Sequence, residues 1–284
     1  MANKKEVKSH IESVSEIQTL TGAMYLIAST KLRRAKTDLK NARGCFSALH
    51  SVLPVLSSDK EVKKSRYFRK NETGSVGFVV ITADKGLAGS YNYNVIRKTN
   101  ALIEEHERTK LFVVGDYGRQ YYAKHKAEMQ EGFSFSSEGH VLRTARDVGD
   151  ILLEQFDKGE LSEVYVVFTD FSGGMSAEVR AERLLPLPCE EGVSENKTEF
   201  FPSAEEAVRS VVPTYVSIFL YGAITDSFCC EQNARMTAMD AANRNAEKLI
   251  DELSVKYDHI RQNTITQEII EVSAGVNRQR QKGE

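Results

Sequence analysis

The sequence has few of the residues that mark metal centres, disulfide frameworks or nucleophilic catalysis. It has no tryptophan and only five prolines, and its six histidines are scattered without an HExxH motif or a GxSxG elbow. Its four cysteines form no CxxC pair, which argues against a zinc site and favours buried thiols in a reducing compartment. They are Cys45, Cys189, Cys229 and Cys230. The sequence therefore predicts no catalytic residue, no metal and no cofactor.

Charge and hydropathy argue against two further classes of protein. Lys and Arg number 38 against 40 Asp and Glu, a formal net charge of −2, so there is no basic excess of the kind that binds nucleic acid. No uninterrupted apolar run reaches the roughly 18 residues that a membrane-spanning helix needs. The first residues do not resemble a signal peptide. We therefore expect no nucleic-acid partner and no direct membrane insertion.

What the sequence does contain is a hydrophobic seam in heptad register through its first 56 residues. Steps of four and three residues alternate, and thirteen of the fifteen seam positions are apolar or aromatic. A period of about 3.5 residues over this length predicts one helix of roughly 80 Å in a left-handed supercoil with a partner. The seam consists of Val7, Ile11, Val14, Gln18, Thr21, Tyr25, Ala28, Leu32, Ala35, Leu39, Ala42, Phe46, Leu49, Leu53 and Leu56.

A second helical segment at the other end of the chain offers that partner. Apolar residues recur at steps of mostly three or four from Met239 to Val276. We expect the helix to run from Thr214 to about Gln281, with Pro213 kinking or restarting it. Because the two helices are joined through the middle of the chain, they are predicted to pair antiparallel. The longer second helix should overhang the first. A generic intramolecular coiled coil and a homodimeric zipper fit the same pattern.

The middle of the chain changes to a strand-like pattern. Short apolar runs rich in β-branched residues alternate with helical stretches, which predicts a buried, largely parallel sheet in a Rossmann-like α/β domain. The predicted strands lie at 77–82, 110–115, 163–169 and 178–187. The predicted helices between them lie at 93–109, 119–127 and 140–158.

The fold class that follows is α/β plus coiled coil. A long antiparallel two-helix coiled coil is formed by the N- and C-terminal helices, and the α/β domain is inserted between them. Ser203 and Glu206 fit a capping box at the start of the second helix. The predicted segments are 1–57 for the first helix, 58–75 for a charged linker, 76–203 for the α/β domain and 204–284 for the second helix.

Glycine-rich turns follow the first three predicted strands, which is where doubly wound sheets bind phosphates. The first turn, Asp84–Ser90, contains neither GxGxxG nor a P-loop. We therefore favour tight turns that let a helix approach a strand over a phosphate site as the explanation of these glycines. We interpret Asp84 and Lys85 as fold-stabilising or interface residues rather than catalytic ones.

Four stretches, in order along nearly the whole chain, resemble the gamma subunit (central-stalk rotor) of rotary F-type ATP synthases. The resemblance implies a non-catalytic shaft inside a ring of alternating alpha and beta subunits, and an α/β domain that contacts the epsilon subunit and the membrane rotor c-ring. It also implies a peripheral location at the cytoplasmic face of the bacterial plasma membrane. The stretches are AMYLIASTKLRRA (23–35), ITADKGLAGSYN (81–92), ARMTAMDAA (234–242) and RQNTITQEI (261–269).

By the same residue matching, the resemblance implies seven partner-contact positions. Gly22 and Tyr25 stand where the family commonly has lysines, so attraction to an acidic loop of beta should be weaker. The basic tail at 277–284 replaces small apolar residues, and it should protrude or meet acidic partners because burying unpaired cations is costly. The seven positions are Met24, Arg235, Arg261, Gln262, Thr266, Gln267 and Glu268.

Two other functions remain compatible with the residues. A nucleotide-binding α/β enzyme with dimerising helical arms would bind its ligand at the turn 86–89. A non-rotary coiled-coil adaptor would show no stoichiometric association with an ATPase ring. For Met24, one residue off the seam, ordinary core packing is as good an explanation as a partner contact.

Overall fold

The computed structural model describes residues 4–171, 177–188, 200 and 203–281 of the 284-residue chain, with the side chains of 58, 60, 61 and 275–281 not described. The chain forms two compact units. The helical unit consists of Met1–Ile27 and Met236–Glu284, and the sheet unit consists of Ala28–Arg235. Two long helices, α1 (Lys4–His50) and α7 (Ala204–Gln281), contribute to both.

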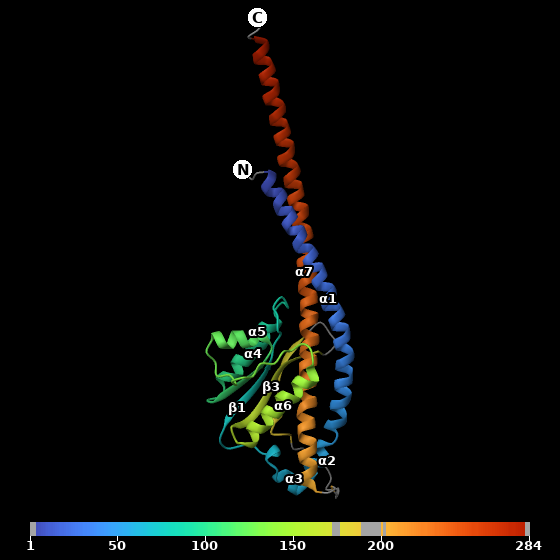
Figure 1. The fold of residues 1–284 in the computed structure, drawn as a ribbon, viewed down its shortest axis with the longest axis vertical. Helices are drawn as coiled ribbons and strands as arrows, with labels where there is room; N and C mark the ends of the chain where they lie inside the picture. The colour runs from blue at the N-terminus through green and yellow to red at the C-terminus, as the bar shows by residue number, and fades with distance from the viewer. Residues whose placement is uncertain (1–3, 172–176, 189–199, 201–202, 282–284) are drawn as a thin grey trace. The chain divides into compact units, whose positions relative to one another are not determined.

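In the helical unit α1 and α7 pack antiparallel (Figure 1). The Lys4 ammonium group, at the start of α1, lies 5.8 Å from the ring centroid of Tyr257, far along α7. Later in α1, Gly22 faces Asn243, which comes earlier in α7. The small core between the helices consists of Val7, Val14, Ala246 and Leu253, flanked by Ile11, Ile250, Tyr257 and Ile260. The predicted pairing of the two ends of the chain is therefore confirmed.

Burial along α1 follows the predicted seam. Every seam position from Val7 to Leu49 is buried or half-buried except Tyr25, which is 36% exposed. The helix nevertheless ends at His50, and a separate helix, α2 (Leu53–Ser58), carries the last two seam residues with Pro54 in its first turn. Proline fits the start of a helix but not its interior, where it removes a hydrogen bond and clashes with the preceding turn. The prediction of one unbroken helix to residue 56 is therefore wrong.

The predicted charged linker contains short helical turns. Helix α3 (Lys60–Lys64) and the 3-10 helix η1 (Arg66–Phe68) follow α2 directly. Val62 of α3 is buried in the same hydrophobic core as Leu53 and Leu56 of α2. This segment is thus packed onto the sheet unit.

The sheet has four strands in the order β2-β1-β3-β4. The first three are parallel, as predicted, whereas β4 runs antiparallel to β3 and makes the sheet mixed. The inner strands are buried almost throughout, but β4 carries several charged, more exposed side chains, as an edge strand commonly does. The strands are β1 (Ser75–Ile81), β2 (Thr109–Val114), β3 (Leu161–Asp170) and β4 (Glu178–Leu185).

Helices cover both faces of the sheet (Figure 1). Helices α4 (Tyr91–Glu104) and α5 (Asp116–Lys124) pack on one face. Helix α6 (Val141–Asp157) packs on the other, where it shares the larger core with the first part of α7. All three were predicted, with ends that differ by up to five residues.

Helix α7 runs through Pro213 without a break, so the predicted restart is wrong. Its start is capped by the Ser203 hydroxyl, which accepts a hydrogen bond from the Glu206 N–H at 3.2 Å, as the capping box predicts. One 18-residue window within Ala204–Ala274, with mean hydropathy 1.4, is apolar enough by composition to cross a membrane. Half of that window is buried in the protein. Val216 and Leu220 of α7 are fully buried in the core of the sheet unit, so core packing accounts for this hydropathy.

Candidate functional site

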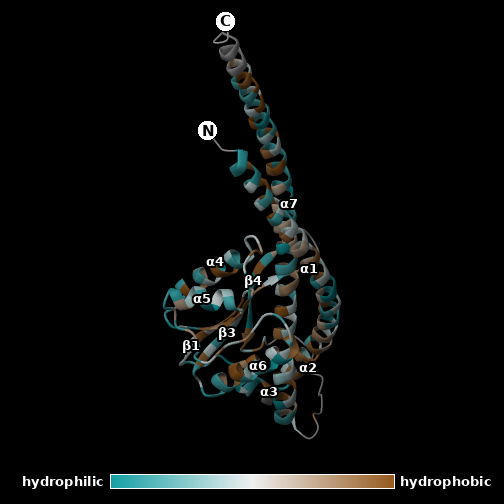
Figure 2. Cartoon of the chain, turned by 45° about the horizontal axis from the view of Figure 1, so that its top comes forward, coloured by the Kyte–Doolittle hydropathy of each residue, from teal (hydrophilic) through white to brown (hydrophobic). Residues whose placement is uncertain are grey.

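The last described turns of α7 extend past its pairing with α1. Every side chain from Arg261 to Ala274 is exposed. The exposed residues include Ile265 (44%), Ile269 (60%), Ile270 (61%) and Val272 (68%). Figure 2 shows this end of α7 with hydrophobic residues among hydrophilic ones. The predicted overhang is confirmed, and its apolar side chains are of the kind that mark interaction surfaces.

Five of the seven predicted contact residues lie on this overhang: Arg261, Gln262, Thr266, Gln267 and Glu268. The Thr266 hydroxyl donates to the Gln262 carbonyl oxygen at 2.9 Å, which keeps it against its own helix. Among these five residues, one side chain is positive, one is negative and two are amides, and they lie beside the isoleucines of the overhang.

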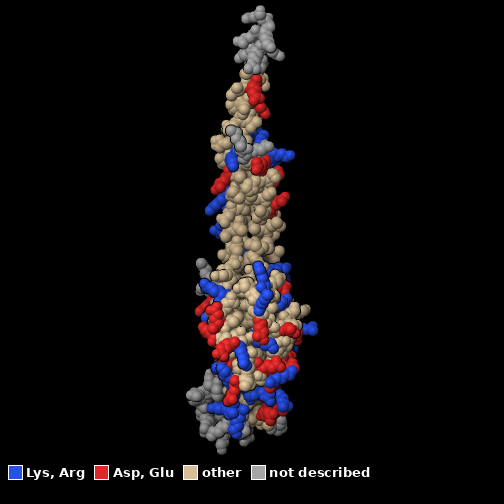
Figure 3. Space-filling view, turned by 90° about the vertical axis from the view of Figure 1, so that its left-hand side faces the viewer, with Lys and Arg blue, Asp and Glu red and all other residues tan. Residues whose placement is uncertain are grey.

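Met24 belongs to a second apolar stripe on α1. It is half-buried, and Ile17 (53% exposed), Leu20 (63%) and Ile27 (56%) lie at helical spacing on the same face. Glu16 is the one charged residue between 13 and 30. Figure 3 shows an uncharged strip along the middle of this unit, with charged side chains at its two edges. An uncharged apolar stripe outside the seam favours a partner contact for Met24 over core packing.

Arg235 lies in the sheet unit, with its guanidinium bound inside the protein. One nitrogen donates to the Glu231 carboxylate at 2.6 Å, and the other donates to the carbonyl oxygens of Gly86 at 3.0 Å and Lys85 at 3.3 Å. The Arg235 and Glu231 side chains are only 11% and 6% exposed. Burial raises the pKa of Glu231, while Arg235 opposes that rise. Arg235 thus ties α7 to the turn after β1, which exposes Leu87 at 63%.

The glycine-rich turns at the strand ends are held by structural contacts. One oxygen of Asp84 accepts hydrogen bonds from the N–H groups of Asp116 at 3.2 Å and Ser137 at 3.3 Å, and the other accepts one from the Ser136 hydroxyl. Gly115 has a φ of +96°, and a Cβ there would lie 2.2 Å from the Thr82 carbonyl oxygen. These contacts favour the fold-stabilising interpretation of Asp84.

A polar network in the sheet unit joins α1, the sheet and α7. A single Arg43 nitrogen lies 2.8 Å from an Asp226 oxygen, 2.7 Å from the Phe171 carbonyl oxygen and 3.4 Å from Asp170. Arg180 of β4 also pairs with Asp170, at 3.0 Å. Burial raises the pKa of Asp226 to about 6, although Arg43 opposes this. Sequence spacing gave no indication of this network because its members come from four distant segments.

Among the residues that the structure describes, no group of three or more His, Cys, Asp or Glu side chains could hold a metal ion. Cys229 and Cys230 are buried, as expected, and burial raises the pKa of the Cys229 thiol to about 12. Cys45 is exposed, which corrects that expectation for this residue, and Cys189 lies outside the described residues. The fold defines a class of protein in which long N- and C-terminal helices pack together and a mixed α/β sheet domain lies between them in the sequence.

Comparisons with known proteins identify the family. The model of the ATP synthase family matches residues 3–278. The ATP synthase gamma chain of Ruminiclostridium cellulolyticum is 32% identical over 97% of this chain and 98% of its own length. The ATP synthase gamma chain of Ruminococcus albus is 36% identical over 96% of this chain and 98% of its own length. The fold is also similar to a chain in the cryo-EM structure of Euglena gracilis mitochondrial ATP synthase, OSCP/F1/c-ring, rotational state 3, with TM-score 0.68, 14% identity and coverage of 96% of this chain and 93% of that one.

The chain belongs to the family of ATP synthase gamma chains, the non-catalytic subunits that form the central rotor stalk of F-type ATP synthases. This membership confirms the resemblance that the four sequence stretches indicated. It also removes the reason for the two alternatives, an α/β enzyme with helical arms and a non-rotary adaptor.

Proposed function

We propose that α1 and α7 of this chain turn inside the ring of alpha and beta subunits, while its α/β domain contacts the epsilon subunit and the c-ring. The chain is part of a membrane-associated ATP synthase F1 sector. In this proposal it lies peripherally at the cytoplasmic face of the bacterial plasma membrane and does not enter the bilayer. The bacterial origin of its relatives supports that location. The proposed functional segments are 1–57, which contains α1 and most of α2, the linker 58–75 with α3 and η1, the α/β domain 76–203, and 204–284, which contains α7.

The observation that carries this proposal is the exposed end of α7. Isolated helices are marginal in water, and most helical stability in proteins comes from packing an apolar face. From Arg261 onward α7 exposes Ile265, Ile269 and other apolar side chains without cover from α1. A surrounding ring of subunits supplies the missing cover in this proposal.

Coupling requires no bond chemistry from this chain. A partner changes a conformational equilibrium only through differential affinity for its states. Because α1 and α7 expose different side chains, the shaft presents a different surface in each direction, and each beta subunit contacts a different surface as the shaft turns. Arg261 contributes a planar fork suited to carboxylates, and Gln262, Thr266, Gln267 and Glu268 supply further polar contacts beside it.

Two further contact positions lie elsewhere on the chain. Met24 contributes through the apolar stripe that it shares with Ile17, Leu20 and Ile27. Arg235 contributes through the turn that it holds, whose exposed Leu87 faces solvent. The tail at 277–284, for which acidic partners were expected, has no described side chains.

The experiment is assembly of the chain with its alpha and beta subunits. Recovery as a single copy within one alpha–beta ring supports the proposal, and recovery only as a free homodimer defeats it. In the assembled complex, Arg261→Ala with Gln262→Ala should lower ATP-driven torque and synthesis while the complex still forms. Arg209→Ala, on the same helix but in the sheet unit and 72% exposed, removes one positive charge as the control. Unchanged torque in the double variant would refute the assignment of these contacts.

A further inference from the structure

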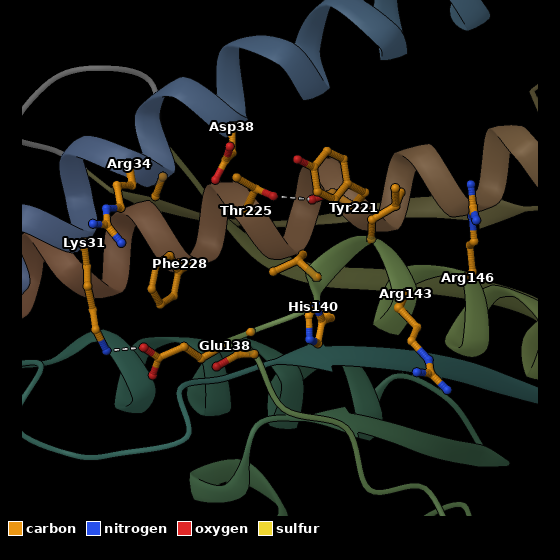
Figure 4. Close-up of a pocket in the computed structure, with 15 residues that line it drawn as sticks. Lys31, Arg34, Asp38, Glu138, His140, Arg143, Arg146, Tyr221, Thr225 and Phe228 are labelled. Atoms are coloured by element: carbon orange, nitrogen blue, oxygen red, sulfur yellow. Dashed lines mark hydrogen bonds and ion pairs between the residues drawn. The ribbon is translucent and has the colours of Figure 1, made fainter.

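The sheet unit contains a cavity that the shaft function does not use. It has a volume of about 860 Å³ and lies between α1, α7, the start of α6 and the loop before it (Figure 4). This volume falls within the range of about 300–1,000 Å³ that is usual for small-molecule sites. Its wall combines basic residues from α1 and α6 with Tyr221 and Phe228 of α7.

The cavity has more positive than negative side chains. Four arginines and lysines line it against two acidic residues, Asp38 and Glu138. Glu138 is already paired with Lys31. Arg34 and Arg146 are exposed and form no ion pair with any residue that the structure describes. Both guanidinium groups are therefore available to an anionic ligand.

The N-terminus of α6 adds to this positive field. The helix is 17 residues long, its first turn contains no acidic residue, and no side chain caps it at His140. Arg143 and Arg146 lie in its first two turns instead. The positive end of a helix dipole favours acidic groups, so basic residues there are unfavourable without an anion nearby. Free backbone N–H groups at such an end are also ready donors to phosphate.

An independent observation concerns Ser137, which lines the cavity. The residue is only 3% exposed, and its hydroxyl has no hydrogen-bond partner among the described residues. Its backbone N–H donates to Asp84, so the serine is held in place through its main chain. Buried polar atoms are nearly always hydrogen-bonded, and an orphaned hydroxyl indicates a missing partner. An oxyanion in the cavity would accept this hydrogen bond.

We propose that the cavity binds a small molecule with a chain of phosphate groups, of the nucleoside diphosphate class. Figure 4 shows Arg34 and Arg146 on opposite sides of His140, so one compact anion does not suit both as well as an extended one. In this arrangement the two guanidinium groups and the start of α6 hold phosphate oxygens, and Ser137 donates to one of them. Phe228 and Tyr221 give the rest of the ligand an apolar wall.

The test is calorimetric titration of the full chain with inorganic phosphate, pyrophosphate and ADP at constant ionic strength. We expect saturable binding, with pyrophosphate and ADP tighter than phosphate. ADP tighter than pyrophosphate shows that the apolar wall contributes, and equal affinities show that the phosphate chain alone is recognised. Arg34→Gln and Arg146→Gln should each weaken ADP binding about tenfold, the effect of losing one charge-assisted hydrogen bond.

Ser137→Ala provides a second line of evidence. It should weaken binding several-fold without lowering the Tm of the free chain, because the hydroxyl has no partner to lose. Arg209→Gln, elsewhere in the sheet unit, removes the same charge from a residue paired with Glu205 and should leave the affinity unchanged. The absence of saturable binding for all three probes at millimolar concentration would overturn the proposal. Equal weakening of binding by Arg209→Gln would also overturn it, and so would unchanged affinity in both Arg34→Gln and Arg146→Gln.

Discussion

Replacing Arg235 by methionine tests how the sheet unit holds the turn after β1. Methionine keeps much of the arginine stem but removes the guanidinium that binds Glu231, Lys85 and Gly86. The Glu231 carboxylate then remains buried, since its side chain is only 6% exposed, with its main positive partner gone. We expect a large loss of stability and a loosened turn.

The magnitude follows from the burial of this pair. Breaking a buried ion pair by removing one partner costs about 3–5 kcal/mol, because an uncompensated charge is left inside. The pKa of Glu231 is already raised by burial, and it should rise further without Arg235. A raised carboxyl pKa means that the folded state holds a proton that the unfolded chain has lost, so the penalty grows as pH rises and shrinks towards pH 5.

Urea unfolding of the full chain, monitored by far-UV circular dichroism at pH 5 and at pH 7, measures this loss of stability. Adding Glu231→Gln to Arg235→Met should recover most of the loss, with a coupling free energy of at least about 2 kcal/mol. The control is Arg244→Met on the same helix, whose partner Asp240 is also four residues away but whose side chain is 70% exposed. That change should cost less than about 1 kcal/mol. Equal losses in both arginine variants would refute the reasoning.

Three further predictions concern other parts of the chain. Burial raises the pKa of Asp226 from 3.8 to about 6, so folded stability should fall by about 3 kcal/mol as pH rises from about 4 to 6. Asp226→Asn should abolish that decline in urea unfolding, and an unchanged decline in this variant would count against the assignment. Gly115→Ala places a methyl group 2.2 Å from a backbone oxygen at a φ of +96°, and should lower the unfolding free energy by more than about 3 kcal/mol; thermal unfolding near the wild-type Tm would show that this prediction is wrong. Val14→Ala, in the seam and 6% exposed, should cost about 1–2 kcal/mol, whereas Leu20→Ala, 63% exposed on the same helix, should cost much less; similar losses in the two variants would mean that the seam does not pack as described.

Periodicity predicted the parts of the fold that depend on which face of an element is buried. The heptad seam located the buried side of α1, because burial repeats with the helix period. It failed at the end of the helix, since Leu53 and Leu56 continue the pattern although they belong to a new helix with Pro54 in its first turn. The apolar runs located the strands, but the antiparallel direction of β4 depends on how the chain returns to the sheet edge, which the pattern does not encode.

Contacts between distant segments could not be predicted in this way. Arg235 matched a family motif, yet its bond to Gly86 joins residues 149 positions apart. The cavity beside Ser137 is lined by three segments that pattern analysis treated separately. The predicted contact residues on the overhang came from the resemblance to the gamma subunit family. Their exposure follows from the unequal lengths of α1 and α7, and their contacts with partners stay a prediction.

Single-molecule rotation tests the central claim most directly. With the alpha–beta ring fixed to a surface and a bead attached to the sheet unit of this chain, ATP hydrolysis should turn the bead in one direction. A chain truncated after Ile260, which lacks the exposed end of α7, should turn it with clearly lower torque. Hydrolysis without rotation, or undiminished torque from the truncated chain, would contradict the account.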